Sequence, residues 1–419
     1  MTAISPTRAA DRIEVIDILR GLAIFGILMV NMHYFVHPWA TLMAPEGAPF
    51  ADAAAAWVIN AFFTGKFFPI FSFLFGLGMS IQMDRAAAKD VRFGPLYARR
   101  LGLLLLFGLA HGLLLWIGDI LTLYALLGFV LLLFFRKTKP RTNWIWAVIL
   151  VGLLTLLTTL SIASLQFAMT IPEAASQIEA TFAESAAITA ASVEEGYIVY
   201  ATGSWVEITA QRAEEFLMLS FAYVPFIAPS VLAMFLIGQA MGKAGRFKDI
   251  EGNLPFFRRL MLWALPIGLV MNIIFASSGV SLAAQGGVFD WTFLLAFVMN
   301  TIGGPVLALG YISAVVVIYH KTRTQILGVL APVGRMALTN YLMHSIIWTT
   351  VFYGYGLGLY GQIGAAVGLG LTLLTYAVQI PFSHWWMSRY RFGPFEWLWR
   401  SLTYMQPQPM RRQAPAGTG

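Results

Sequence analysis

The chain has 419 residues, of which 58% are hydrophobic and 11% are charged, and its formal net charge at pH 7 is +7. A soluble domain carries about 25% charged residues, because its surface must be wetted. The composition therefore excludes a soluble enzyme, a disordered protein and a coiled coil, and it indicates a polytopic helical membrane protein. The chain has no cysteine, which excludes disulfides, thiolate catalysis, iron–sulfur clusters and cysteine zinc sites.

Apolar runs that are long enough to cross a bilayer recur along the whole chain. We place about ten spans, at 16–36, 55–83, 101–117, 119–135, 143–169, 216–241, 259–277, 290–319, 326–352 and 362–386. With the N-terminus inside, all but four of the 27 basic residues fall in inside segments, and the exceptions are Arg20, Lys66, Arg212 and Arg335. Basic residues concentrate in cytoplasmic loops, so the charge indicates orientation and requires no nucleic acid partner. We predict an all-α transmembrane bundle with both termini cytoplasmic.

We divide the chain into four parts. Residues 1–169 are expected to form an N-terminal membrane half of five spans, and residues 216–400 a C-terminal half of five spans. Between them, the segment 170–215 is rich in alanine and glutamate, and it predicts one or two helices on the outer surface, either as a solvated connector or as a lid over an outward-facing cavity. The tail 401–419 is rich in proline, glutamine and glycine and is expected to be largely disordered.

Polar residues in the first span are informative, because an ionisable group at the centre of a membrane helix costs about 3 kcal/mol. Asp17 and Arg20 are three residues apart, so they share a helix face as an ion pair. Asn31 lies about three turns beyond Arg20 and continues the same stripe. His33 and His37 are four residues apart at the outer end. The stripe either fixes helix packing or faces a substrate or cofactor.

Two further spans carry buried polar groups. In the second span, Lys66 is followed by Pro69, which predicts a break at membrane depth. In the hairpin of the third and fourth spans, His111 precedes Asp119 by eight residues, so the two should share a side. A histidine oriented by an acid is a candidate general base, although a buried histidine also serves as a packing residue.

The ninth span carries polar groups that point in two directions. Arg335 is a buried cation, whereas Asn340 and His344 form an i, i+4 pair rotated away from it. This pattern predicts a helix that faces both a cavity and a neighbouring helix. We expect Asn31, Asn340 and His344 to contact a substrate.

Three stretches resemble the YeiB-like family of bacterial inner-membrane proteins. They are RxxxxDxLRGLAxxGILxVN at 12–31, FGLxHGLLLWxGDIL at 107–121, and PVGRMALTNYL at 332–342 together with GPFEWLWRSLTY at 393–404. The likeness covers 1–135 and the C-terminal half, and the acidic segment 170–215 carries no part of it. The resemblance implies a multi-pass protein of a bacterial inner (plasma) membrane.

That family is similar to a superfamily of transmembrane acyltransferases, which includes heparan-α-glucosaminide N-acetyltransferase and O-antigen acyltransferases. The resemblance implies transfer of an acyl group, in particular acetyl, from cytosolic acyl-CoA to an acceptor that is usually a sugar. The shared first-span pattern of Asp, Arg-Gly and then Asn or His places Asp17 and Arg20 near the donor and Asn31 further along.

The catalytic histidine of these acetyltransferases follows the first span. His33 and His37 both lie close to that place, but neither has the expected spacing, so the base remains open among His33, His37 and His111. The chemistry itself needs a general base for the acceptor hydroxyl, a cation at the developing oxyanion and basic groups for the phosphates of CoA. Besides Arg20, the cations available for these roles are Lys66 and Arg335.

We therefore expect a membrane acyltransferase with acyl-CoA as co-substrate and no metal. Its partners would be membrane lipids and a small-molecule, sugar or lipid acceptor. A secondary transporter or flippase is the main alternative, because a broken span and buried charges suit it equally well. A non-catalytic scaffold is a third reading. The sequence leaves the oligomeric state open, a homodimer included.

Overall fold

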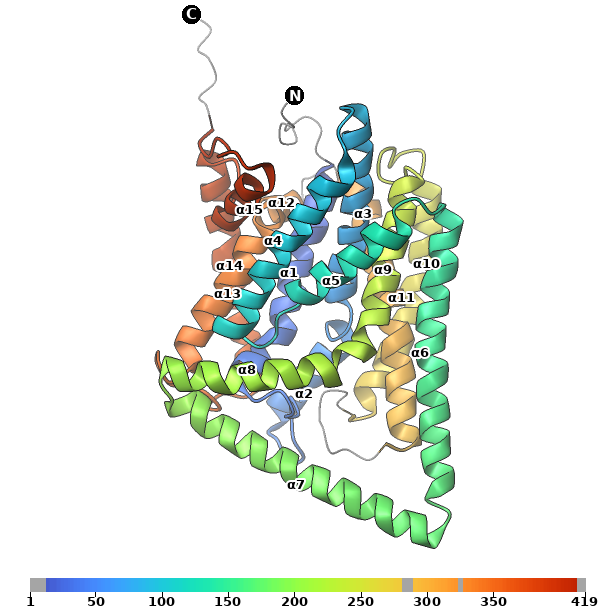
Figure 1. The fold of residues 1–419 in the computed structure, drawn as a ribbon, viewed down its shortest axis with the longest axis vertical. Helices are drawn as coiled ribbons and strands as arrows, with labels where there is room; N and C mark the ends of the chain where they lie inside the picture. The colour runs from blue at the N-terminus through green and yellow to red at the C-terminus, as the bar shows by residue number, and fades with distance from the viewer. Residues whose placement is uncertain (1–12, 281–288, 323–326, 413–419) are drawn as a thin grey trace, which may run out of the picture.

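The computed structural model describes residues 13–280, 289–322 and 327–412, and within these ranges it is a bundle of helices without a strand. Helix α1 (Glu14–Val36) begins at one end of the bundle, which we call the terminal end (Figure 1). Helix α15 (Pro394–Tyr404) lies at the same end. Helices α7 (Pro172–Thr202) and α8 (Trp205–Ala222) cross the other end, which we call the opposite end. The expectations for the inside segments at 1–12 and 323–326, and for the tail at 413–419, lie outside the described residues.

Within the described ranges, eight helical segments are long and apolar enough to cross a membrane. They are α1, α2 (Phe50–Phe62) with α3 (Phe67–Ala88) as a single crossing, α4 (Phe93–Leu114), α6 (Pro140–Ala168), α9 (Val224–Lys243), α10 (Leu254–Ser277), α11 (Trp291–Thr322) and α14 (Ala365–Arg389). The all-α polytopic fold is thus confirmed.

The two other expected spans form shorter helices. Range 119–135 contains α5 (Leu121–Val130), which continues as the π-helical turn η2 (Leu131–Phe135). Range 326–352 contains the short 3₁₀ turn η3 (Gly328–Leu330), α12 (Ala331–Arg335) and α13 (Ala337–Phe352), with a break at Met336. The expectation of one continuous ninth helix was wrong, so the relative directions of Arg335 and Asn340 cannot be derived from helical periodicity.

The sixth span begins later than predicted. We expected it to start at 216, but α8 continues to Ala222 across the opposite end and α9 starts at Val224. Pro225 in the first turn of α9 has no N–H to continue the hydrogen-bond ladder of α8, and its ring favours the start of a new helix. The chain therefore turns sharply at Tyr223.

The expectation of a largely disordered tail was wrong for 401–412. Helix α15 continues to Tyr404, and the following residues fold back beside the end of α14. The indole of Trp397 donates to the carbonyl of Gln408 at 2.7 Å, and the backbone N–H of Arg391 donates to the carbonyl of Met410 at 2.9 Å. These bonds give the segment after α15 a fixed path.

The core of the bundle is centred on the contact between α3 and α9. A Cβ atom on Gly76 would lie 1.8 Å from the carbonyl oxygen of Phe235, and one on Gly238 would lie 1.9 Å from the carbonyl oxygen of Phe73. The two backbones therefore touch at glycine, as in other close-packed membrane helices. Because α3 and α9 come from different halves of the sequence, the two halves share one core.

Candidate functional site

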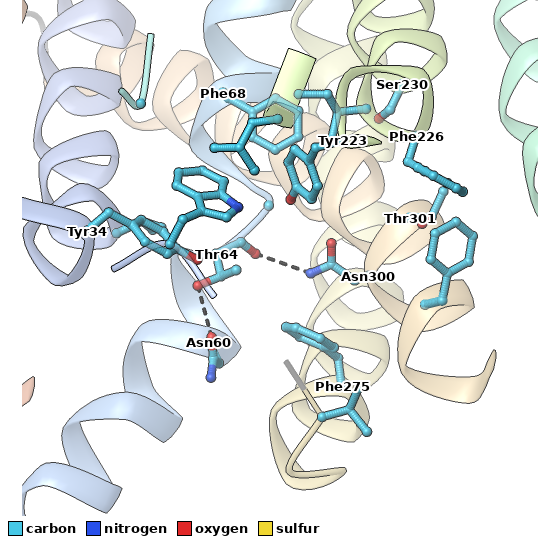
Figure 2. A pocket seen from close by; sticks show the side chains of 18 of the residues that line it. Tyr34, Asn60, Thr64, Phe68, Tyr223, Phe226, Ser230, Phe275, Asn300 and Thr301 are labelled. Atoms are coloured by element: carbon cyan, nitrogen blue, oxygen red, sulfur yellow. Dashed lines mark hydrogen bonds between the residues drawn. The ribbon is translucent and has the colours of Figure 1, made fainter. Parts of the chain in front are cut away.

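A cavity of about 1080 Å³ lies among α1, α2, α3, α6, α9 and α11. The parts of α9 and α11 that line it belong to their N-terminal halves, which are the halves nearer the opposite end (Figure 1). Figure 2 shows the side chains of Tyr34, Asn60, Thr64, Tyr223 and Asn300 around this space. The cavity is therefore built where the second span breaks.

The break between α2 and α3 is held together by Lys66. The helix stops at Phe62 and restarts at Phe67, and Gly65 in the gap has a φ of 79°. Lys66 is fully buried, and its ammonium donates to the carbonyl of Asn60 at 2.6 Å and also to the carbonyl of Thr64. A cation at the carbonyl end of a helix satisfies unpaired acceptors and complements the helix dipole. The predicted break is present, but it precedes Pro69, which lies in the first turn of α3.

Amide and hydroxyl groups cross-link the break to α11. The hydroxyl of Thr64 donates to the amide oxygen of Asn60 at 3.0 Å, and the amide nitrogen of Asn300 donates to the carbonyl of Thr64 at 3.4 Å (Figure 2). All three residues line the cavity, and so does Asn31 from α1. Asn31 thus lines the cavity, and its contact with a substrate stays a prediction.

A buried chain of three polar side chains stands beside the cavity. The Nδ1–H of His111 donates to the carboxylate of Asp119 at 2.9 Å, and the hydroxyl of Ser345 donates to Nε2 of His111 at 2.8 Å. The same carboxylate also accepts from the backbone N–H of Leu121 at 3.1 Å and of Thr122 at 2.8 Å. A hydroxyl, an imidazole and an orienting carboxylate in this order are the parts of a nucleophilic or general-base device.

Tyr341 lies against both this chain and the cavity. His111 is 2% exposed and Ser345 is fully buried, whereas Gly118, Asp119 and Tyr341 line the cavity. The side chain of Asp119 has no exposed surface, so its backbone forms the wall. The phenol of Tyr341 donates to the carbonyl of Gly118 at 3.1 Å, and its ring lies 5.0 Å from the ring of His111. Tyr341 therefore contacts both the cavity and the ring of His111.

The acid and arginines expected near a donor lie at the terminal end. Arg20 and Asp17 pair at 3.0 Å, as their spacing predicted, and Nε of Arg335 lies 3.9 Å from the other carboxylate oxygen of Asp17. The side chains of Arg20 and Arg335 are 33% and 24% exposed. Lys66 is not part of this group, because it is enclosed at the break of the second span.

The two histidines at the outer end of the first span contact segments that lie beyond it. The Nε2–H of His33 donates to the carbonyl of Thr41 at 3.3 Å. The Nε2–H of His37 donates to the carbonyl of Ile363 at 3.0 Å, and its Nδ1 accepts from the hydroxyl of Tyr197 on α7 at 2.9 Å. Neither histidine lines the 1080 Å³ cavity. Of the three candidate bases, His111 alone has the acid and hydroxyl partners that general-base chemistry requires, as far as the described residues show.

The polar pair on α13 faces α14. Asn340 donates to the carbonyl of Val333 at 3.0 Å, and His344 accepts from the amide of Gln379 at 2.9 Å. Neither lines the cavity. The structure therefore places Asn31 at the cavity, and it places Asn340 and His344 in a contact between two helices.

Comparison with known proteins places these features in a family. Residues 241–406 match the family described as "Protein of unknown function (DUF418)". The chain is 40% identical over 430 residues to "Uncharacterized protein YxaH" of Bacillus subtilis (strain 168), covering 99% of each chain. It is 30% identical over 409 residues to "Uncharacterized protein YeiB" of Escherichia coli (strain K12), covering 95% of this chain and 98% of that one. The chain belongs to the YeiB-like family.

The relatives extend the resemblance beyond the motifs. Because the alignment with the Bacillus subtilis relative covers 99% of this chain, it includes the acidic segment 170–215, which we expected to carry no part of the likeness. That segment forms α7 and most of α8. No solved structure matches this YeiB-like chain.

Sequence reasoning missed several residues of this candidate site. Ser345 directly follows the singled-out His344, but only the fold shows that it meets His111. Asn60 and Asn300 were also missed. Each is a side-chain amide within an apolar run. Burying a polar side chain in a membrane helix costs free energy, and this cost was the signal that could have identified both residues.

Proposed function

We propose that this YeiB-like protein is an acyltransferase of the bacterial inner membrane. It moves an acyl group, in particular acetyl, from cytosolic acyl-CoA to a hydroxyl or amine of an acceptor held in the 1080 Å³ cavity. The observation that carries the proposal is the hydrogen-bonded chain from Ser345 through His111 to Asp119 beside that cavity. The excess of basic residues at the terminal end supports a cytoplasmic position for that end.

His111 is the general base in this proposal. Its Nε2 takes the proton of the acceptor hydroxyl while the oxygen attacks the thioester carbonyl, and Asp119 holds the ring and stabilises the imidazolium. The carbon–sulfur bond breaks as the carbon–oxygen bond forms, and the proton passes from His111 to the departing thiolate. In the resting protein the hydroxyl of Ser345 is hydrogen-bonded to Nε2 of His111. It lies at the position that the acceptor hydroxyl takes in the reaction.

The donor requires cations at the cytoplasmic end. The guanidinium groups of Arg20 and Arg335 are partly exposed there, and guanidinium pairs with phosphate oxygens in a bidentate manner. These two residues, oriented by Asp17, would hold the phosphates of acyl-CoA. Lys66 does not fit that role, because it has no exposed surface and its ammonium is committed to the end of α2.

The proposal is tested with purified protein in lipid nanodiscs. Radiolabelled acetyl-CoA is offered together with bacterial inner-membrane lipids or with sugars, and label in the acceptor is counted. We expect His111→Gln to reduce transfer by about 10²–10⁴-fold. The matched control is His384→Gln, since His384 is exposed and its Nε2–H donates to the carbonyl of Val329. Absence of transfer by the wild-type protein, or equal transfer by the two variants, would contradict the proposal.

A secondary transporter or flippase is the second candidate, and the break between α2 and α3 favours it. Discontinuous helices whose ends face a central cavity are typical of transporter substrate sites. A transporter would move its substrate across proteoliposomes without acyl-CoA. The acyltransferase predicts instead that the labelled acceptor appears only when acyl-CoA is present.

A further inference from the structure

The cavity has two chemically different sides. Amides and hydroxyls from α1, α2 and α11 form one side, which we call the amide end: Asn31, Tyr34, Asn60, Thr64 and Asn300. Hydrocarbon side chains from α6 and α11 form the other, which we call the apolar limb: Leu154, Leu157, Ile162, Leu165, Phe293 and Phe297. A ligand that fills both sides must itself be amphiphilic.

The lining carries no exposed charge within the described residues. Asp119 is its one acidic or basic residue among those described, and the carboxylate of Asp119 has no exposed surface and is bonded to His111. Lys66 lies behind the break and is fully buried. Burying an unpaired charge in such a space is costly, so a ligand with a phosphate, carboxylate or ammonium group fits poorly.

The amide end matches a head group with hydroxyls. Asn60 and Asn300 are joined through Thr64, with bonds of 3.0 and 3.4 Å (Figure 2). Each side-chain amide has two donor hydrogens and an acceptor oxygen, so these bonds leave further donors and acceptors at the cavity. Hydroxyl groups donate and accept in the same way, and they carry no charge.

The apolar limb has the length of a hydrocarbon chain. The four limb residues on α6, which are Leu154, Leu157, Ile162 and Leu165, line the cavity together with Thr158 and Ser161, and their spacing places all six on one face of α6. From the first to the last of them α6 rises about 16 Å, at 1.5 Å per residue. The whole cavity, at about 1080 Å³, is at the upper limit of pockets that hold drug-sized molecules.

We propose that the cavity binds an uncharged lipid, with a hydroxyl-bearing head at the amide end and a hydrocarbon chain along the apolar limb. The further statement that this lipid is the acyl acceptor rests on the proposed function. In that reaction the head-group hydroxyl forms the new carbon–oxygen bond, the thioester carbon–sulfur bond breaks, and the proton passes through His111 to the thiolate of CoA.

Binding is tested with radiolabelled 1-monooleoylglycerol and the purified full-length protein in detergent. We expect saturable binding at one site. Glycerol carries the head without the chain and should not compete. Oleoyl lysophosphatidylglycerol carries the same chain with an added phosphate, and it should compete about tenfold or more weakly, because its charge finds no partner. Equal competition by glycerol or by the anionic lipid would overturn the proposal, and neither comparison needs a variant.

A pair of neighbouring leucines on α6 tests the position of the chain. Leu157 lines the cavity and is 55% exposed, whereas Leu156 is outside the lining and is 54% exposed. Leu157→Trp narrows the apolar limb and should weaken binding about tenfold, the effect of losing about two buried methylenes. Leu156→Trp should leave binding unchanged. Equal effects of the two substitutions would overturn the placement of the chain along α6.

The same preparation separates this inference from the proposed function. If 1-monooleoylglycerol binds but receives no acetyl group from acetyl-CoA, the lipid site stands and the acyltransferase fails. If acetyl groups are transferred to a water-soluble acceptor and 1-monooleoylglycerol does not bind, the acyltransferase stands and the lipid site fails.

Discussion

The hydroxyl of Ser345 on α13 donates a 2.8 Å hydrogen bond to His111 on α4, although the two residues are 234 positions apart in the chain. The other ring nitrogen of His111 is bound by Asp119, which follows α4. In membrane bundles a hydrogen bond between helices contributes about 0.6–2 kcal/mol. The bond therefore fixes α4 against α13 in addition to its place in the proposed chemistry.

Ser345→Ala should separate these two contributions. Nε2 of His111 loses its partner, and a buried unpaired polar atom costs about 1–3 kcal/mol, so we expect a loss of that size in the free energy of unfolding. Acyl transfer should persist, because His111 and Asp119 remain. Unfolding by denaturant and the acetyl-transfer assay measure the two effects.

The matched control is Ser313→Ala, since the hydroxyl of this buried serine donates within its own helix to the carbonyl of Leu309. Loss of transfer in a folded Ser345→Ala protein, to the level of His111→Gln, would contradict the role proposed for Ser345 and would make its hydroxyl the nucleophile.

Gly65 should tolerate no side chain, because it combines a φ of 79° with close contact to α11. A Cβ atom there would lie 2.8 Å from the amide oxygen of Asn300. Gly65→Ala should cost about 1–2 kcal/mol for the left-handed backbone alone and displace Asn300, which weakens binding of 1-monooleoylglycerol. Gly102 on α4 has open space around its Cα, so Gly102→Ala should be neutral or stabilise by about 0.4–1 kcal/mol. Equal stability of the two variants would contradict this account.

The sequence predicted the parts of the site that depend on local spacing. Asp17 and Arg20 meet because three residues bring side chains to one face of a helix. His111 and Asp119 meet because the hairpin turn directly follows α4. Lys66 marked the broken span because a lysine at that depth needs acceptors, which the carbonyls at the end of α2 supply.

The rest depends on which helices become neighbours, and spacing along the chain carries no such information. Ser345 reaches His111 only because α13 packs beside α4, and Asn300 reaches Thr64 only because α11 packs beside the break. The break at Met336 removed the periodicity by which we related Arg335 to Asn340. The sequence therefore predicted pairs that lie close together in the chain but did not predict the long-range partners of its candidate residues.

Lys66→Met should destabilise the break between α2 and α3. The substitution keeps a long apolar side chain but removes the donors that bind the carbonyls of Asn60 and Thr64. Hydrogen bonds from a charged group contribute about 1.5–3 kcal/mol each, so losing both bonds should lower the free energy of unfolding by about 3–6 kcal/mol. Lys137→Met changes an exposed lysine and is the control. Equal stability of the two variants would contradict the capping role of Lys66.

Glu396 joins α15 to the start of α13. Its carboxylate accepts from the backbone N–H of Leu338 at 2.7 Å and of Thr339 at 3.1 Å, and from the hydroxyl of Thr339 at 2.6 Å. A carboxylate at the N-terminus of a helix is a favourable cap. Burial nevertheless raises the pKa of Glu396, and the hydrogen bonds from Thr339 and Leu338 oppose that shift without cancelling it.

Stability should therefore depend on pH through Glu396. The pKa of Glu396 is higher in the folded protein than in the unfolded chain. At pH values between these two pKa values the folded protein therefore binds more protons than the unfolded chain, and the contribution of Glu396 to stability is lost as the pH rises. We expect wild-type protein to gain free energy of unfolding relative to Glu396→Gln as the pH falls from neutral towards the ordinary pKa of glutamate. Denaturant unfolding at several pH values measures this difference, and Glu184→Gln, at an exposed position on α7, is the control. If wild type instead loses stability relative to Glu396→Gln on acidification, the hydrogen bonds to Leu338 and Thr339 outweigh burial and the pKa is lowered.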